Sequence, residues 1–169
     1  MKKHKAKKHG KTNKGFSLIE LLIVVAIILI IAAIAIPNLL RSRIAANEAS
    51  AVGSVRTLNT AEVTYNTTYP TVGFTGLANL GPYASGGSAS SAAAGLIDAN
   101  LASGTKSGYS FTLTPSTAVP ATDYQSAAAP VTAGTTGQRY FCSDSSGVIQ
   151  YNSTGSTGTT CASGSNTPI

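Results

Sequence analysis

The fold is decided by residues 16–36, which read FSLIELLIVVAIILIIAAIAI. The stretch is apolar except for Ser17 and Glu20. As an α-helix, about 20 residues span roughly 30 Å, the thickness of the hydrocarbon core of a bilayer. The stretch therefore predicts a helix that can cross a membrane.

A basic segment precedes this stretch. Residues 1–15 hold 7 of the 12 Lys and Arg residues and both histidines: Lys2, Lys3, His4, Lys5, Lys7, Lys8, His9, Lys11 and Lys14. Lysines before a span, with few charges after it, place the N-terminus on the cytoplasmic side. We expect the rest of the chain to be exported. The lysines have no aromatic residues between them, so no specific nucleic-acid site is expected.

The remaining chain is nearly neutral and polar. Five basic residues face six acidic ones: Arg41, Arg43, Arg56, Lys106 and Arg139 against Glu20, Glu48, Glu62, Asp98, Asp123 and Asp144. Only 11% of all residues are charged and 43% are hydrophobic. This composition, in which Gly, Ser, Thr, Ala and Asn make up much of the rest, is common in surface-exposed bacterial proteins.

The two cysteines, Cys142 and Cys161, have no CxxC spacing, and no histidine follows His9. These residues cannot assemble a zinc site, and no metal site is expected. A disulfide in an oxidising compartment is the expected use of the pair, with two free buried thiols as the alternative.

The helix is expected to continue beyond the apolar stretch. Pro37 lacks an N–H and crowds the preceding turn, which predicts a kink there rather than the end of the helix. Residues 38–68 are amphipathic, and apolar side chains recur on one helical face: Ala51, Val55, Leu58 and Tyr65. The sequence predicts one helix of about 50 residues.

The rest of the chain indicates a small head with strands. A variable loop rich in Gly, Pro and Ser follows Tyr69-Pro70, and a short helix is expected at about 92–102. Alternation predicts a strand at 109–113, closed by Pro115, and a weaker one near 124–128. The clearest hairpin joins 139–142 to 148–151 through the turn Asp144-Ser145-Ser146-Gly147.

These patterns predict an α+β fold, in which a long N-terminal helix packs through its second half on a small antiparallel sheet. The expected divisions are a leader at 1–15, a hydrophobic helix at 16–37, an amphipathic helix at 38–68 and a head at 69–169. The head would end in a disulfide-bounded loop. A free hydrophobic helix needs either lipid or the centre of an assembly of like helices.

Residues 14–20, Lys-Gly-Phe-Ser-Leu-Ile-Glu, resemble the type III signal peptide of type IV pilins and pseudopilins. The resemblance implies cleavage between Gly15 and Phe16 by a membrane-embedded prepilin peptidase, followed by N-methylation of Phe16. It also implies a structural subunit that leaves the bacterial inner membrane with the help of the pilus assembly machinery. The product would be a homopolymeric extracellular filament that supports adhesion, twitching motility or DNA uptake.

Glu20 is the expected assembly contact. A carboxylate at bilayer depth costs a few kcal/mol, so it should have a partner. Cleavage after Gly15 would create a cationic α-amine on Phe16, and a neighbouring subunit displaced along the fibre could offer that amine to Glu20. This ion pair would favour one register between neighbouring subunits over the others.

Several alternatives remain at this point. Ala33-Ile34-Ala35 could be the cleavage site of an ordinary secretory signal, although the apolar stretch is longer than such signals require. A pseudopilin of a type II secretion system and a monomeric membrane-anchored surface protein are the other readings. Neither an ordinary signal nor a simple anchor explains Glu20.

No enzymatic site is expected. A chain cleaved after Gly15 has no histidine, so neither a Ser-His-Asp triad nor a histidine base can form. The acids Asp98, Asp123 and Asp144 are scattered, and Asp144 is better explained as a turn residue than as a calcium ligand. We expect no catalytic residue and no cofactor.

Overall fold

The computed structural model describes residues 15–153, 161 and 166–169. The expected leader lies outside the described residues, apart from Gly15. The chain divides into two compact units, Met1–Leu39 and Leu40–Ile169.

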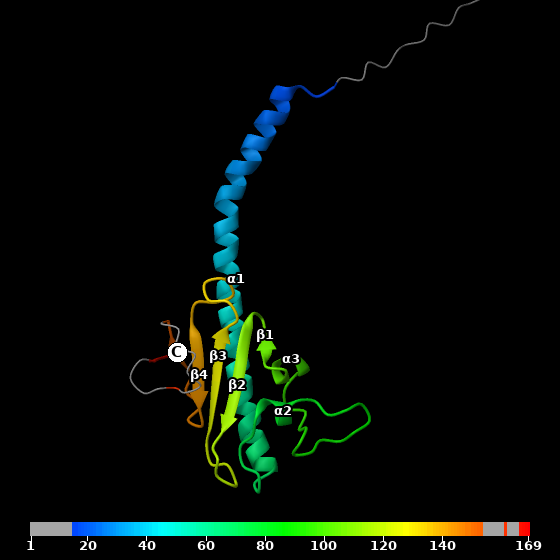
Figure 1. The fold of residues 1–169 in the computed structure, drawn as a ribbon, viewed down its shortest axis with the longest axis vertical. Coiled ribbons are helices and arrows are strands. Elements are labelled where there is room, and N and C mark those ends of the chain that lie inside the picture. The colour runs from blue at the N-terminus through cyan, green and yellow to red at the C-terminus, as the bar shows by residue number, and fades with distance from the viewer. Residues whose placement is uncertain (1–14, 154–160, 162–165) are drawn as a thin grey trace, which may run out of the picture. The chain divides into compact units, whose positions relative to one another are not determined.

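The helix α1 runs from Leu18 to Thr68 and contains Pro37 without interruption (Figure 1). Its 51 residues confirm the expected single long helix. A proline inside a helix removes one hydrogen bond, and helices on both sides of it can continue. The expected kink at Pro37 stays a prediction.

The second unit contains a six-stranded antiparallel sheet in which every strand pairs with its neighbours in the sequence. The strands are β1 (Thr105–Lys106), β2 (Tyr109–Pro115), β3 (Tyr124–Pro130), β4 (Tyr140–Asp144), β5 (Gln150–Asn152) and β6 (Thr167–Pro168). The long helix and this sheet confirm the α+β prediction. β3 is two residues longer than expected and pairs with β2 along seven residues.

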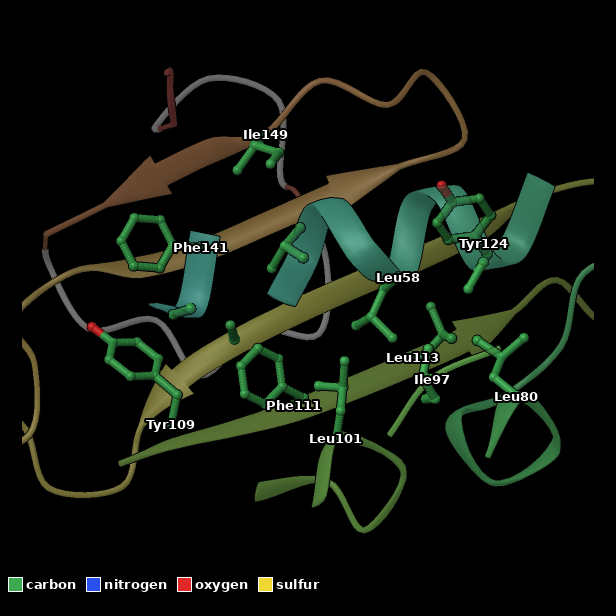
Figure 2. Packing of buried hydrophobic residues seen from close by; sticks show 14 of the residues in the cluster. Leu58, Leu80, Ile97, Leu101, Tyr109, Phe111, Leu113, Tyr124, Phe141 and Ile149 are labelled. Atoms are coloured by element: carbon green, nitrogen blue, oxygen red, sulfur yellow. The ribbon is translucent and has the colours of Figure 1, made fainter. Parts of the chain in front are cut away.

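The core lies between α1 and one face of the sheet (Figures 1 and 2). In β2, buried Tyr109, Phe111 and Leu113 alternate with exposed residues, as a strand with one covered face requires. The helix contributes the four side chains that the periodicity selected, since Ala51, Val55, Leu58 and Tyr65 are all buried. Leu80, Ile97 and Leu101 close the core from the segment between helix and sheet (Figure 2).

The prediction of a helix at about 92–102 is wrong for most of these residues. Only Ala99–Ala102 form a helix, α3, whose N-cap Asp98 accepts a hydrogen bond from the N–H of Leu101. Gly95 has a φ of +68°, a conformation that does not fit an α-helix. The N–H groups of Leu96 and Ile97 both donate to the carbonyl of Leu80. Leu80 ends the short helix α2 (Leu77–Leu80), which the sequence did not predict. Hydrogen bonds to α2 therefore replace helical hydrogen bonds at Leu96 and Ile97.

The predicted hairpin is confirmed as β4 and β5, with Phe141 opposite Tyr151. Asp144 acts as a turn residue, because its Oδ1 accepts the N–H of Ser146 at 2.9 Å. The two-residue strands β1 and β6 were not predicted, since so short a segment shows no alternation.

Candidate functional site

The chain is not helical at Gly15, Phe16 and Ser17, and α1 begins immediately afterwards at Leu18. The carboxylate of Glu20 accepts the backbone N–H of Ser17, with 2.9 Å between N and Oε2. A Ser followed three residues later by a Glu is the pattern of a capping box, and this bond is one half of it. Glu20 thus fixes the start of its own helix.

The bond between Gly15 and Phe16 is open to approach. The Phe16 side chain is 93% exposed, and nothing lies within 4 Å of the position that a Cβ would take on Gly15. Because the segment is neither helical nor covered by the described part of the chain, a protease could bind it as an extended strand.

The apolar side chains of the first unit lie on the surface of the single chain. Leu18, Leu29 and Ile36 are examples, each more than half exposed. By length and composition α1 can cross a membrane, a test that signal sequences also pass. Glu20 is the only ionisable side chain among residues 15–39, so its own unit offers it no described cation.

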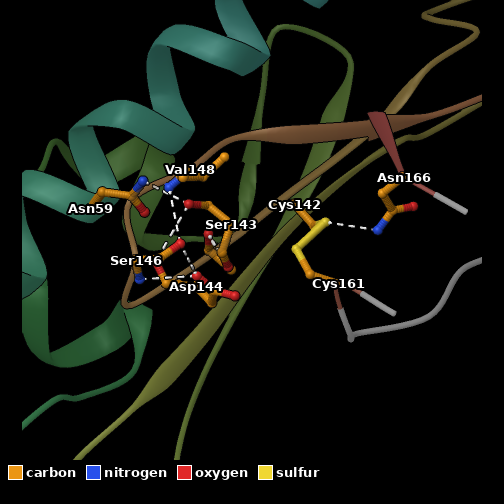
Figure 3. Close-up of a disulfide and its surroundings, with 9 residues drawn as sticks. Asn59, Cys142, Ser143, Asp144, Ser146, Val148, Cys161 and Asn166 are labelled. Carbon is orange, nitrogen blue, oxygen red and sulfur yellow. Dashed lines mark hydrogen bonds between the residues drawn. A yellow bond between two sulfur atoms is a disulfide. The ribbon is translucent and has the colours of Figure 1, made fainter. Parts of the chain in front are cut away.

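The disulfide between Cys142 and Cys161 is present, with 5.6 Å between the Cα atoms (Figure 3). Cys142 lies in β4, and the Nδ2 of Asn166 approaches its sulfur at 3.5 Å. The bridge therefore ties Cys161 to the sheet, and the expected disulfide is confirmed. Among the described residues no group of His, Cys, Asp and Glu is arranged to hold a metal ion.

The sequence analysis gave no role to Glu48, a buried residue of α1. Its Oε1 accepts the N–H groups of Gln138 and Arg139, and its Oε2 accepts the Nε of Arg139 at 2.8 Å. Burial alone would raise the pKa of Glu48, but these hydrogen bonds and the guanidinium lower it overall. The Arg139 guanidinium also lies over the rings of Phe141 and Tyr151. Glu48 thereby fixes the segment before β4 to the helix.

Glu62 is the second buried acid of α1, and it is fully covered. Its carboxylate accepts the backbone N–H of Thr75, and no salt bridge reaches it from the described residues. Burial raises the pKa of Glu62 to about 7, against a smaller lowering by the Thr75 hydrogen bond.

A signal for both acids was present in the sequence. Glu48 and Glu62 continue the buried face of α1, whose members are spaced by three or four residues: Glu48, Ala51, Val55, Leu58, Glu62 and Tyr65. An acid at such a position is expected to be buried and to need donors.

Comparison with known proteins concerns the N-terminal segment. A family model described as the prokaryotic N-terminal methylation motif matches residues 10–36. The chain is 47% identical over 53 residues, 31% of its length, to the type IV major pilin protein of Myxococcus xanthus. It is 69% identical over 38 residues, 22% of its length, to the type IV wide pilus major component of Thermus thermophilus. The N-terminal segment is thus similar to the corresponding segments of these type IV pilins.

The matched segment is a limited part of each relative. The matches cover 24% of the Myxococcus protein and 29% of the Thermus protein, so the chain spans about a quarter of the relatives' length. No solved structure matches the chain. Gly15, Phe16 and Glu20 all fall inside the matched motif, whereas Cys142 and Cys161 lie in the head. The structure places these two groups in different units.

Proposed function

We propose that the chain is the structural subunit of a type IV pilus filament. One observation carries the proposal: Glu20 is the only ionisable side chain of residues 15–39, in an otherwise apolar helix whose side chains are exposed, and it lies inside a methylation motif. A charge in such a helix is costly in lipid and therefore marks a function.

Prepilin peptidase would cleave after Gly15, and Phe16 would then be methylated on its α-amine. The non-helical and exposed chain at these residues supports this step. The new α-amine is the cation that Glu20 of a neighbouring copy requires, because removing both charges from water is tolerated only when they pair.

The precursor would reside in the bacterial inner membrane with its N-terminus in the cytoplasm, since the lysines precede the span. The assembly machinery would then transfer the helix from lipid to the centre of a filament of identical subunits. Both environments cover the apolar side chains, which water does not tolerate over so large an area.

The test uses the chain as the sole pilin copy in its host. We expect sheared surface fibres whose main subunit, by mass spectrometry, begins at a methylated Phe16. An N-terminus at Ile36 would instead establish an ordinary signal peptide. A retained leader without fibres would establish a membrane anchor, and fibres confined to the periplasm a pseudopilin. Attachment, twitching and transformation assays of the deletion strain then assign the filament's task.

A further inference from the structure

Two exposed arginines, Arg41 and Arg43, are well separated along α1 from the exposed aspartates of the second unit. Two pairs are satisfied within the chain: Glu48 with Arg139, and Asp98 with Lys106, each at 2.8 Å. Among the described residues of this unit, five charged side chains that reach solvent take part in no ion pair: Arg41, Arg43, Arg56, Asp123 and Asp144. The three arginines all belong to α1, whereas Asp123 immediately precedes β3 and Asp144 is the last residue of β4, at the same end of these two strands.

The aspartates lie level with Asn59 of α1. Tyr124, next to Asp123, donates its hydroxyl to the Oδ1 of Asn59 at 3.2 Å. Asn59 in turn donates to Ser143 and to the carbonyl of Gly147, which flank Asp144 on either side (Figure 3). The two loops are also joined through the sheet, where Gln125 pairs with Asp144.

The basic end is the first turn of α1 within this unit, where Arg41 and Arg43 are both exposed. From Arg43 to Asn59 the helix advances by 16 residues, or about 24 Å at 1.5 Å per residue. This exceeds the screening length of about 8 Å at physiological salt, so the two groups do not attract each other within one chain.

Both carboxylates are held in place by their own loops. The Oδ1 of Asp123 accepts the N–H of Tyr124 at 2.7 Å, and the Oδ1 of Asp144 accepts the N–H of Ser146. In each case Oδ2 has no hydrogen-bond partner in the described part of the chain. An oriented carboxylate with one free oxygen suits a guanidinium, which needs little reorganisation to bind it.

We infer that Asp123 and Asp144 of one copy bind Arg41 and Arg43 of a second copy displaced along the axis of α1. This inference rests on the proposed filament and names one of its contacts between heads. The two patches differ, so the contact is heterologous and repeats from copy to copy without closing, as a filament requires. Exposed charges of this kind fix register and partner more than they add affinity.

Charge reversal in the full-length chain, present as the sole copy, tests the contact. We expect D123K with D144K, and separately R41D with R43D, to lower the yield of sheared fibres at least tenfold. The four substitutions together should restore at least half of the yield. A49D is the matched control, because Ala49 is exposed on α1 and lies six residues from Arg43 and ten from Asn59, about 9 Å and 15 Å along the helix, so it should leave the yield near wild type.

Normal fibre yield from both reversed variants would overturn the inference, and so would a combined variant that is processed and oxidised normally yet recovers nothing. A second measurement is independent of variant stability: mild oxidation of fibres carrying R43C with D123C should give a ladder of linked subunits. Fibres with A49C and D123C should not, because Ala49 is exposed on α1 between the two charged groups. An absent ladder in the first case overturns the contact alone. A wild-type strain without any fibre would instead overturn the proposed function.

Discussion

Glu62 and Thr75 are joined by a hydrogen bond inside the core, with 3.0 Å between the Thr75 nitrogen and the Oε2 of Glu62. The bond connects α1 to the loop that precedes α2. Tyr124 is the titratable neighbour: burial raises the pKa of its phenol to about 12, and the Glu62 carboxylate acts in the same direction. The Thr75 N–H therefore stabilises the charge of Glu62, but the effect of burial is larger.

This arrangement predicts that the head becomes more stable as the pH falls from 8 to 5. The pKa of Glu62 is about 7 in the folded chain and 4.5 as an ordinary glutamate. Between these two pH values the folded state thus binds more protons than the unfolded state. The resulting gain in the free energy of unfolding is complete below pH 4.5 and is lost as the pH rises through 7. The difference is about 3 kcal/mol at 1.4 kcal/mol per pKa unit. Urea unfolding of the chain in detergent measures it.

E62Q is the matched control for this prediction. Glutamine keeps the acceptor for the Thr75 N–H and cannot ionise, so the variant should be more stable than wild type at pH 8 and should lose the pH dependence between 5 and 8. Equal pH profiles for the two proteins would show that Glu62 is not the titrating group.

Removal of the Glu48 carboxylate is expected to destabilise the head strongly. E48A leaves the guanidinium of Arg139 without its partner and removes the acceptor for the backbone N–H groups of Gln138 and Arg139. Each buried backbone donor left without its acceptor costs about 1 to 3 kcal/mol, and the guanidinium adds less because its side chain is 44% exposed to water. R43A, an exposed substitution on the same helix, should cost less than about 0.5 kcal/mol. Thermal unfolding of both variants compares them, and similar midpoints would contradict the assigned role.

The lowered pKa of Glu48 predicts that the head loses stability at strongly acidic pH. Because its folded pKa lies below 4.5, its contribution is present above pH 4.5 and is lost as the pH falls through the folded value. The wild-type head should therefore be destabilised at strongly acidic pH, and E48A should lack that part of the decline.

Alanine substitutions at two glycines separate the cost of a steric clash from the cost of backbone strain. Gly73 and Gly134 have nearly the same φ, +83° and +80°. A Cβ on Gly73 would overlap the carbonyl oxygen of Ala121, whereas a Cβ on Gly134 meets nothing within 4 Å. G134A should cost about 1 kcal/mol for the left-handed conformation. G73A should cost at least about 2 kcal/mol more, because the bridge between Gly73 and Ala121 must separate. Equal unfolding free energies would refute this account.

The sequence predicted those elements whose pattern is long or marked by a turn. The alternation at Tyr109–Leu113 and the turn at Asp144–Gly147 gave β2 and the β4–β5 hairpin, and the apolar period of 3.6 gave the buried face of α1. The spacing of Leu96, Ile97 and Leu101 wrongly indicated a helix over about 92–102. The N–H groups of Leu96 and Ile97 bind the Leu80 carbonyl, a partner that local sequence does not reveal.

The residues of the candidate site likewise fall into those that the sequence could reveal and those that only the fold shows. Gly15, Phe16 and Glu20 could be selected from the sequence because a charge inside an apolar stretch is conspicuous by itself. The capping bond from Ser17 to Glu20 follows the Ser-x-x-Glu spacing and could also have been read. The contacts of Glu48 and Glu62 join residues 90 and 13 positions apart, respectively. Only the folded chain shows which donors reach them.

The Glu20 carboxylate has two possible tasks, and one substitution separates them. Its bond to the Ser17 N–H needs an acceptor, which glutamine retains. Its proposed pairing with the α-amine of a neighbouring Phe16 needs a negative charge, which glutamine lacks. E20A removes both the acceptor and the charge, so it serves as the companion variant.

We expect E20Q to be cleaved after Gly15 at nearly the wild-type level and to assemble poorly, because the start of α1 is preserved while the α-amine of the next subunit is left unpaired. Breaking one side of a buried ion pair costs about 3 to 5 kcal/mol, enough to shift an assembly equilibrium by a factor of a hundred or more. With the variant as sole copy, immunoblots of sheared and membrane fractions should show processed subunit retained in the membrane. E20A should add a cleavage defect if the capping bond positions the scissile segment. Normal fibres in normal number from E20Q would exclude the charge of Glu20 from assembly and leave it only the capping bond.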